Sequence, residues 1–193
     1  ITDDDATTTV FWLVGSQASG EDKGTMSFVA QLSAASGFDV TVPFTADFMV
    51  STATHEVDYA ITVSPVTISA GATTTTITIS VVNDTLDEND ETVVVKMGTP
   101  TNGTQGATTT HTATITDDDA TTPVFWSVGS QASVGENGTM LVTAQLSTAS
   151  GLDVTVPFTI SGTATSTDYT TTPSPITILA GGTTGTATIT ITE

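Results

Sequence analysis

The chain of 193 residues carries 21 acidic and 2 basic side chains, a formal net charge of −19 and no cysteine. Its length allows one large domain or two domains of about 100 residues, and its hydrophobic fraction of 37% is too high for a disordered acidic tail. The missing cysteines exclude disulfides, zinc thiolate sites and cysteine nucleophiles, and the scarcity of basic side chains argues against nucleic acid or an anionic membrane as a partner.

Threonine makes up 47 residues of the chain, and this β-branched side chain favours strands. Alternation of apolar and polar residues predicts strands, in chain order, at residues 25–32, 39–45, 63–69, 76–81, 91–97 and 110–116. Turn signals such as Ala70-Gly71 and Asn102-Gly103 separate them. The pattern predicts an all-β fold, an antiparallel sandwich of about seven strands. Pro43 and Pro157 interrupt strand-like runs and predict an edge strand or a bulge.

An internal repeat organises the chain. The first eight residues recur at 115–122, an offset of 114, and the agreement continues from Trp12 with Trp126. After a loop that is four residues shorter in the second copy, Asp58 corresponds to Asp168 at an offset of 110. The repeat unit has the size of one β-sandwich. We therefore expect the end of a preceding repeat at residues 1–5, a complete repeat at 6–119 and a partial repeat at 120–193.

The partial repeat lacks counterparts of about residues 84–119. A sandwich without them would expose an unpaired sheet edge and half of its core. We therefore expect the chain to be a piece of a longer tandem-repeat protein. The alternative is that strands of a neighbouring chain complete the second repeat.

The acidic residues of the complete repeat fall between its predicted strands. They form four groups: Glu21-Asp22, Asp58, the turn from Asp84 to Glu91, and Asp117 to Asp119. A sandwich brings distant loops together at its ends, so these groups predict about eight converging carboxylates with few cations to balance them. Such a cluster repels itself unless a multivalent cation neutralises it. Carboxylates in that number suit Ca²⁺, with Mg²⁺ second, and the alternative is that they are solvated loop acids.

Several of these segments together resemble the Calx-beta motif: Asp58-Tyr59, Ala70-Gly71 before a threonine-rich strand, the turn Asn83 to Glu91, and the closing Ile115 to Asp119. Calx-beta modules are known from sodium–calcium exchangers, integrin β4 and many bacterial surface proteins. The resemblance implies tandem immunoglobulin-like sandwiches that bind Ca²⁺ at one end.

The metal ligands that the resemblance implies are Glu21, Asp58, Asp84, Glu88, Glu91, Asp117, Asp118 and Asp119. Asn83 stands where the family has an aspartate, so one charge is missing and the number of bound ions is left open. In the second copy, only Glu136 and Asp168 match the ligand positions.

Three functions agree with this pattern. The first is a calcium-binding structural segment, a stalk or fibre of a secreted or cell-surface protein, in which Ca²⁺ stiffens the junctions between repeats. The second is a calcium-sensing regulatory module, and the third is an adhesive domain that binds a sugar or a protein.

We do not expect an enzyme, because His55 and His111 are the only histidines and no serine lies in a Gly-x-Ser-x-Gly motif. No run approaches the ~18 apolar residues of a membrane span. The expected partners are calcium ions, neighbouring repeats and identical chains in a fibre.

Overall fold

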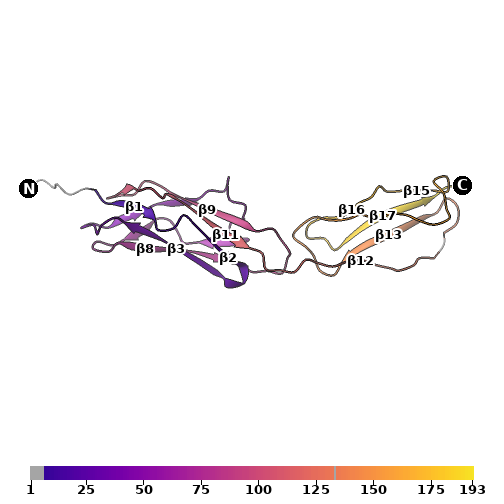
Figure 1. Cartoon of the computed structure of the whole chain (residues 1–193), viewed down its shortest axis with the longest axis horizontal. Coiled ribbons are helices and arrows are strands. Elements are labelled where there is room, and N and C mark those ends of the chain that lie inside the picture. The colour runs from indigo at the N-terminus through magenta and orange to yellow at the C-terminus, as the bar shows by residue number, and fades with distance from the viewer. Residues whose placement is uncertain (1–6, 133) are drawn as a thin grey trace, which may run out of the picture. The chain divides into compact units, whose positions relative to one another are not determined.

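The computed structural model describes residues 7–132 and 134–193, so the expected end of a preceding repeat at residues 1–5 lies outside the described residues. Contacts divide the chain into two compact units. The first contains Ile1–Asp84 and Asn89–Asp118, and the second contains Thr85–Glu88 and Asp119–Glu193. Each unit is built of strands, which Figure 1 labels along the chain.

The first unit is a sandwich of two main sheets. One sheet has the strand order β10-β1-β3-β8-β6 and the other has the order β2-β11-β9-β5, while β4 and β7 form a separate pair. The strands are β1 (Thr9–Trp12), β2 (Ser16–Gly20), β3 (Thr25–Leu32), β4 (Val40–Val42), β5 (Phe44–Ala46), β6 (Tyr59–Ile61), β7 (Val66–Ile68), β8 (Thr74–Val81), β9 (Glu91–Met97), β10 (Thr104–Gln105) and β11 (Thr110–Thr116), and the 3-10 helix η1 (Glu21–Lys23) follows β2.

The alternating sequence of β8 shows why these residues form strands. Ile77 and Ile79 are fully buried, whereas the threonines between and before them face outward or are half-buried. β8 pairs antiparallel with β3, whose Met26, Phe28, Ala30 and Leu32 are buried in the same alternation. The predicted strands 25–32, 91–97 and 110–116 coincide with β3, β9 and β11. The expected all-β sandwich is confirmed.

Pro43 lies between two strands that belong to different sheets. β4 before it pairs with β7, and β5 after it pairs with β9. Proline lacks a backbone N–H, so it interrupts a ladder where the chain changes partners. The predicted single strand at 39–45 is therefore two short strands, with the proline at the switch.

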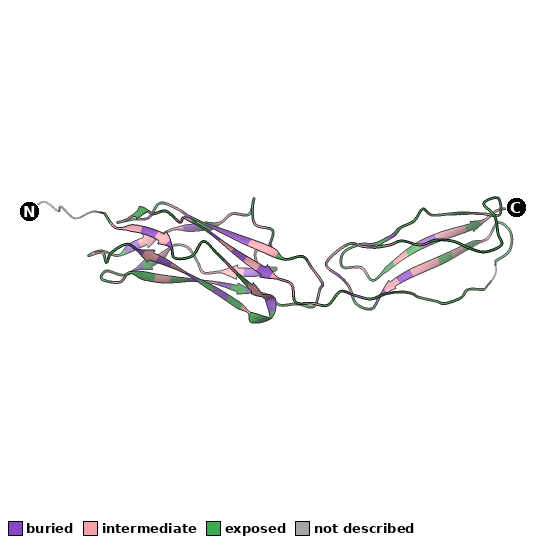
Figure 2. Ribbon diagram, in the orientation of Figure 1, coloured by how far each residue is buried: buried purple, intermediate pink, exposed green. Residues whose placement is uncertain are grey.

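The core of the first unit is aromatic at its centre. Trp12 packs edge-on against Phe28 and Phe44, with ring centroids 5.2 and 6.4 Å apart. His111 of β11 stacks on Phe28 at 4.1 Å, so it bridges the two sheets. Figure 2 shows buried positions alternating with less buried ones along the strands of this unit. His111 is fully buried, in phase with Ala113 and Ile115, and thus has a packing role in the core.

The second unit repeats part of this architecture. Its main sheet has the order β12-β13-β17-β15, and β14 pairs with β16. The bounds are β12 (Val124–Trp126), β13 (Thr139–Leu146), β14 (Val154–Val156), β15 (Tyr169–Thr171), β16 (Ile176–Ile178) and β17 (Thr184–Ile191). Its buried cluster is smaller and consists of Ala144, Leu146, Ile176, Ile178 and Ala187. Among the described residues, no helix is long and apolar enough to cross a membrane.

Two of the predicted turns require backbone conformations that few residues tolerate. Asn102 and Asn137 adopt positive φ values of 59° and 61°, and asparagine is one of the few residues other than glycine that enters this region readily. Gly71 and its counterpart Gly181 have φ values of 80° and 75°. The glycine turn therefore recurs in both units, whereas Asn102 and Asn137 lie at different places in the repeat.

The buried His111 predicts a pH-dependent stability of the first unit. Burial lowers the pKa of this histidine, and the hydrogen bond between Nδ1 and the Val14 carbonyl, at 2.9 Å, opposes that shift only partly. As the pH falls below the ordinary value of about 6.5, the unfolded chain binds a proton that the folded chain resists, so the free energy of unfolding decreases. We expect the melting temperature to fall between pH 7 and pH 5 by more in the native sequence than in His111→Phe.

The matched control is Thr110→Val, at an exposed position of the same strand that carries no titratable group. This variant should keep the full pH dependence. Equal pH dependence in the native sequence and in His111→Phe would show that other groups carry it.

Candidate metal centre

The pairing of β2 with β11 brings two acidic segments to the same end of the first sandwich. The two strands run parallel, with Thr116 opposite Gly20 at their last residues. Glu21 opens η1 directly after Gly20, and Asp117 to Asp119 follow Thr116. Parallel neighbours end at the same edge of a sheet, so both segments leave the sandwich side by side.

A third segment arrives from the other sheet. β8 pairs antiparallel with β3, and the N–H of Val81 donates to the carbonyl of Gly24 at 2.9 Å. Asp84 follows three residues after Val81 and thereby lies close to η1. The sheet register, rather than proximity in the sequence, determines this meeting of residues 21, 84 and 119.

Glu21, Asp84 and Asp119 form the acidic cluster of the site. One carboxylate oxygen of each lies within 4.8 Å of the other two. Glu21 is buried with an exposed fraction of 9%, Asp119 is half-buried and Asp84 is exposed. In the described part of the chain, this is the one group of three such side chains with metal-ligand spacing. Oxygen donors of this kind suit hard divalent cations.

Asp117 adds a second feature to the site. Its Oδ1 is buried and has no hydrogen-bond partner among the described residues, although its backbone N–H donates to Oδ1 of Asp90 at 3.1 Å. A buried carboxylate oxygen without a donor is costly. A cation at this end of the sandwich would satisfy it, so the residues present fit a metal ion.

The basic side chain nearest this end is Lys23. It forms an exposed ion pair with Asp22, and the hydrogen bond to Asp22, with a smaller contribution from Asp118, raises the pKa of the Lys23 ammonium. Exposed pairs of this kind contribute little to stability. Lys23 therefore compensates its neighbours Asp22 and Asp118.

The other predicted ligands lie outside the three-residue cluster. Asp58 accepts a hydrogen bond from the Thr54 N–H at 2.5 Å through its carboxylate, and from the Val82 N–H at 2.9 Å through its carbonyl. Glu91 opens β9, opposite Ile115. Glu88 lies in the acidic turn before β9 and is not one of the three clustered side chains. The structure thus gathers three of the eight predicted side chains and places Asp117 and Asp118 in the same run as the third.

Asp90 contributes to this end of the sandwich, although it is not among the eight predicted ligands. Its carboxylate accepts the hydrogen bond from the Asp117 N–H and so ties the acidic turn to the end of β11. The sequence feature that points to Asp90 is its position in the acidic turn, one residue before β9 begins.

Of the two matching residues in the second unit, Asp168 keeps the kind of surroundings that Asp58 has, and Glu136 differs from Glu21. Asp168 accepts hydrogen bonds from the N–H and hydroxyl of Thr165 at 2.6 and 3.0 Å, and the N–H is the main cause of its lowered pKa. Glu136 is exposed, in contrast to the buried Glu21. Asp168 thus acts as a local turn cap.

Repulsion within the cluster predicts the effect of removing one charge without metal. Unit charges 4 to 5 Å apart repel by about 1 kcal/mol even at the dielectric of water. In a chelator, we therefore expect Asp84→Asn to raise the melting temperature of the first unit by a few degrees. Differential scanning calorimetry measures this change. The control Glu56→Gln removes an exposed charge outside the cluster, and an equal rise there would attribute the effect to net charge alone.

Comparison with known proteins places this geometry in a family. The model of the Calx-beta domain matches residues 3–121. No curated protein matches the chain in sequence. Among solved structures, the apo form of the Calx CBD1 domain is 18% identical, with a TM-score of 0.54, over 59% of this chain and 100% of that chain.

Two other solved structures match nearly all of the chain. CBD12 from CALX1.2 is 20% identical, with a TM-score of 0.53, over 96% of this chain and 75% of that chain. The calcium binding domain CBD12 of CALX1.1 is 21% identical, with a TM-score of 0.52, over 95% and 76% of the two chains. At these identities the likeness concerns the fold. Because the family model covers more than half of the chain, the chain belongs to the Calx-beta domain family.

Proposed function

We propose that this chain is a calcium-binding module whose ion is held by Glu21, Asp84 and Asp119, with Asp117 as a further ligand. The observation that carries the proposal is the convergence of three carboxylate oxygens to within 4.8 Å at one end of the first sandwich. Membership of the Calx-beta family supports it, as does the likeness to a structure described as the calcium binding domain CBD12.

Calcium fits this donor set better than magnesium does. Ca²⁺ accepts six to eight oxygen ligands in flexible geometry, whereas Mg²⁺ demands a near-ideal octahedron and keeps several waters. The cluster combines a buried, a half-buried and an exposed carboxylate from three separate segments. Such a set is irregular and open to water on the side of Asp84.

The wider role that we propose is structural: a repeat in a stalk or fibre of a secreted or cell-surface protein, with no catalytic activity. The identical segments 1–8 and 115–122 support it, because the same eight residues lead into both repeats. A calcium-sensing module and an adhesive domain are the alternatives. The repetition of these eight residues favours the structural role over the calcium-sensing module and over the adhesive domain.

In this role the ion would restrain the connection that follows β11. Asp117 to Asp119 leave the strand and lead directly into residues 120–123. An ion held by Glu21, Asp84 and Asp119 would link the first residues of this connection to two other segments of the first unit. Calcium would thereby limit the directions in which the connection leaves the sandwich.

Calcium binding predicts a metal-specific gain in stability. Ligand at about 100 times its Kd stabilises the folded state by about 2.7 kcal/mol per site. We therefore expect millimolar Ca²⁺ to raise the melting temperature of the first unit above the value in Mg²⁺ or in a chelator. Asp119→Asn should remove this rise, and Glu56→Gln should keep it.

The variant Glu88→Gln distinguishes the ligand set that the family motif implies from the set of three clustered carboxylates. The family resemblance makes Glu88 a ligand, whereas the three clustered carboxylates are those of Glu21, Asp84 and Asp119. A retained calcium response in this variant supports the geometric assignment. Equal melting temperatures in all three conditions for the native sequence would refute calcium binding.

Restraint of the connection predicts a narrower range of distances between the two units in Ca²⁺. The chain has no cysteine, so Thr45→Cys and Thr177→Cys, at exposed strand positions, allow spin labels without background. We expect the distance distribution from pulsed electron resonance to narrow when Ca²⁺ replaces chelator.

A control pair at Ser27 and Thr45 lies within the first unit and should not change. An unchanged distribution for the Thr45 and Thr177 pair, combined with a calcium-dependent melting temperature, would refute the stiffening role and retain calcium binding.

A further inference from the structure

The loop between β5 and β6 is longer in the first unit than its counterpart in the second. The carboxylate of Asp58 accepts a hydrogen bond from the N–H of Thr54, 4 positions earlier, whereas that of Asp168 accepts from the N–H of Thr165, 3 positions earlier. The turn before β6 therefore holds one added residue, and the other added residues lie between β5 and Thr54. This additional length is specific to the first unit.

The longer loop carries exposed apolar side chains and a strained acid. Phe48, Met49 and Val50 are exposed by 66%, 93% and 57%. Glu56 is exposed and has a φ of 67°, a left-handed conformation that glutamate seldom adopts. Backbone strain of this kind clusters at ligand sites, where the surrounding structure maintains it. A contiguous apolar surface likewise marks a site for a partner.

Phe48 and Glu56 line the same hollow, which lies beside the edge strands β5 and β6 of the two sheets. The hollow measures about 370 Å³, and its lining includes Phe44 and Ile61 from these strands. The ring of Phe48 lies edge-on to His55 with a centroid distance of 6.2 Å, and Nε2 of His55 lies 3.3 Å from Oε1 of Glu56. An aromatic ring and a carboxylate therefore border one apolar space.

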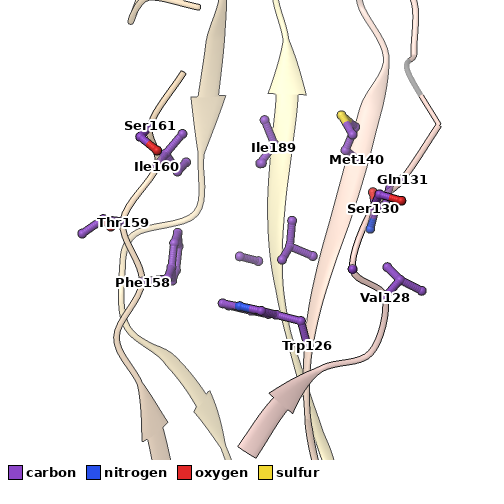
Figure 3. Close-up of a pocket in the computed structure, with 13 residues that line it drawn as sticks. Trp126, Val128, Ser130, Gln131, Met140, Phe158, Thr159, Ile160, Ser161 and Ile189 are labelled. Carbon is purple, nitrogen blue, oxygen red and sulfur yellow. The ribbon is translucent and has the colours of Figure 1, made fainter. Parts of the chain in front are cut away.

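The corresponding place in the second unit has no such acid. Figure 3 shows the matching segment from Phe158 to Ser161, which borders an apolar hollow of its own. Among the described residues that line that hollow, none is charged. The combination of an exposed ring with a carboxylate is thus a property of the first unit.

The backbone beside the hollow favours a side chain as the occupant over an added strand. The N–H of Phe44 already donates to Oγ of Ser64 at 2.8 Å. In addition, β5 has only 3 residues, Phe44–Ala46. A strand laid along this edge would find little free backbone to pair with.

Charge identifies the kind of side chain. Neither lysine nor arginine is among the described residues that line the hollow, and the chain has a formal net charge of −19. Its two basic side chains, Lys23 and Lys96, are both paired with aspartates. A cationic partner is therefore attracted, whereas a second copy of this chain would bring mainly negative charge.

We propose that this hollow binds an arginine side chain of a partner protein. The guanidinium stacks on the ring of Phe48 and pairs with the carboxylate of Glu56. Its methylene groups cover the apolar surface that Phe44 and Ile61 provide. Arginine combines these contacts because its planar cation stacks on aromatic rings, binds carboxylates in bidentate geometry and has an apolar stem. The proposal does not rest on calcium binding.

The test is a titration of the isotope-labelled full chain with the blocked peptide Val-Arg-Val, followed through amide chemical shifts in nuclear magnetic resonance. A second peptide carries citrulline, which keeps the shape of arginine and removes its charge. We expect saturable shifts at Phe48, Glu56 and Thr62, which line the hollow, with the arginine peptide. The citrulline peptide should cause none.

Matched variants locate the site. Phe48→Ala should weaken binding of the arginine peptide about fivefold, and Glu56→Gln should abolish the saturable shifts. Phe38→Ala alters another ring, which is 71% exposed and does not line the hollow. Glu136→Gln removes an exposed acid of the second unit. Both controls should bind as the native chain does.

Glu56→Gly separates loss of the site from loss of the fold. Glycine adopts a positive φ without strain, so this variant should raise the melting temperature of the first unit while it loses the shifts. Equal binding of the arginine and citrulline peptides would overturn the proposal, as would full affinity in Glu56→Gln. Shifts confined to Glu21, Asp84 and Asp119, or no saturable shift at all, would also overturn it.

Discussion

The parallel pairing of β11 with β2 is the constraint on which both the core and the acidic site of the first unit depend. The pairing sets Thr116 opposite Gly20, so the run Asp117 to Asp119 emerges beside Glu21. The same strand places His111 against Phe28 and closes the sandwich. One strand thus buries apolar surface along its length and brings carboxylates together at its end.

The second unit shows what the other elements form when this strand is absent from the described residues. Its β13 and β17 keep the register of β3 and β8, and its buried cluster remains around Ala144 and Leu146. The first sheet therefore forms through its own antiparallel pairing. In the second sheet of the first unit, the outer strands β2 and β5 pair with β11 and β9, whereas the corresponding residues 130–132 and 158–160 of the second unit are not strands.

Much of the fold followed from the sequence, and the exceptions have a physical cause. β3, β9 and β11 were predicted to the residue: β3 and β11 alternate strictly and have one face in the core, and β9 carries a run of three buried valines. β2 was missed, since Ser16–Gly20 has no apolar alternation and is a strand only through its pairing with β11. The acidic cluster is similar. Composition and motif named Glu21, Asp84 and Asp119 among eight candidates, but only the register across the sheets could separate these three from Glu88 and Glu91.

The dependence of site and core on one strand couples the proposed metal binding to folding. Before β11 pairs with β2, residues 117–119 have no fixed relation to Glu21, so the cluster and its mutual repulsion do not exist. When the strand docks, burial of Ala113 and Ile115 drives the process, and the converging carboxylates oppose it. A cation would remove that opposition only in the docked state. Metal binding would therefore act on the closing step of the sandwich, whereas the first sheet would form without it.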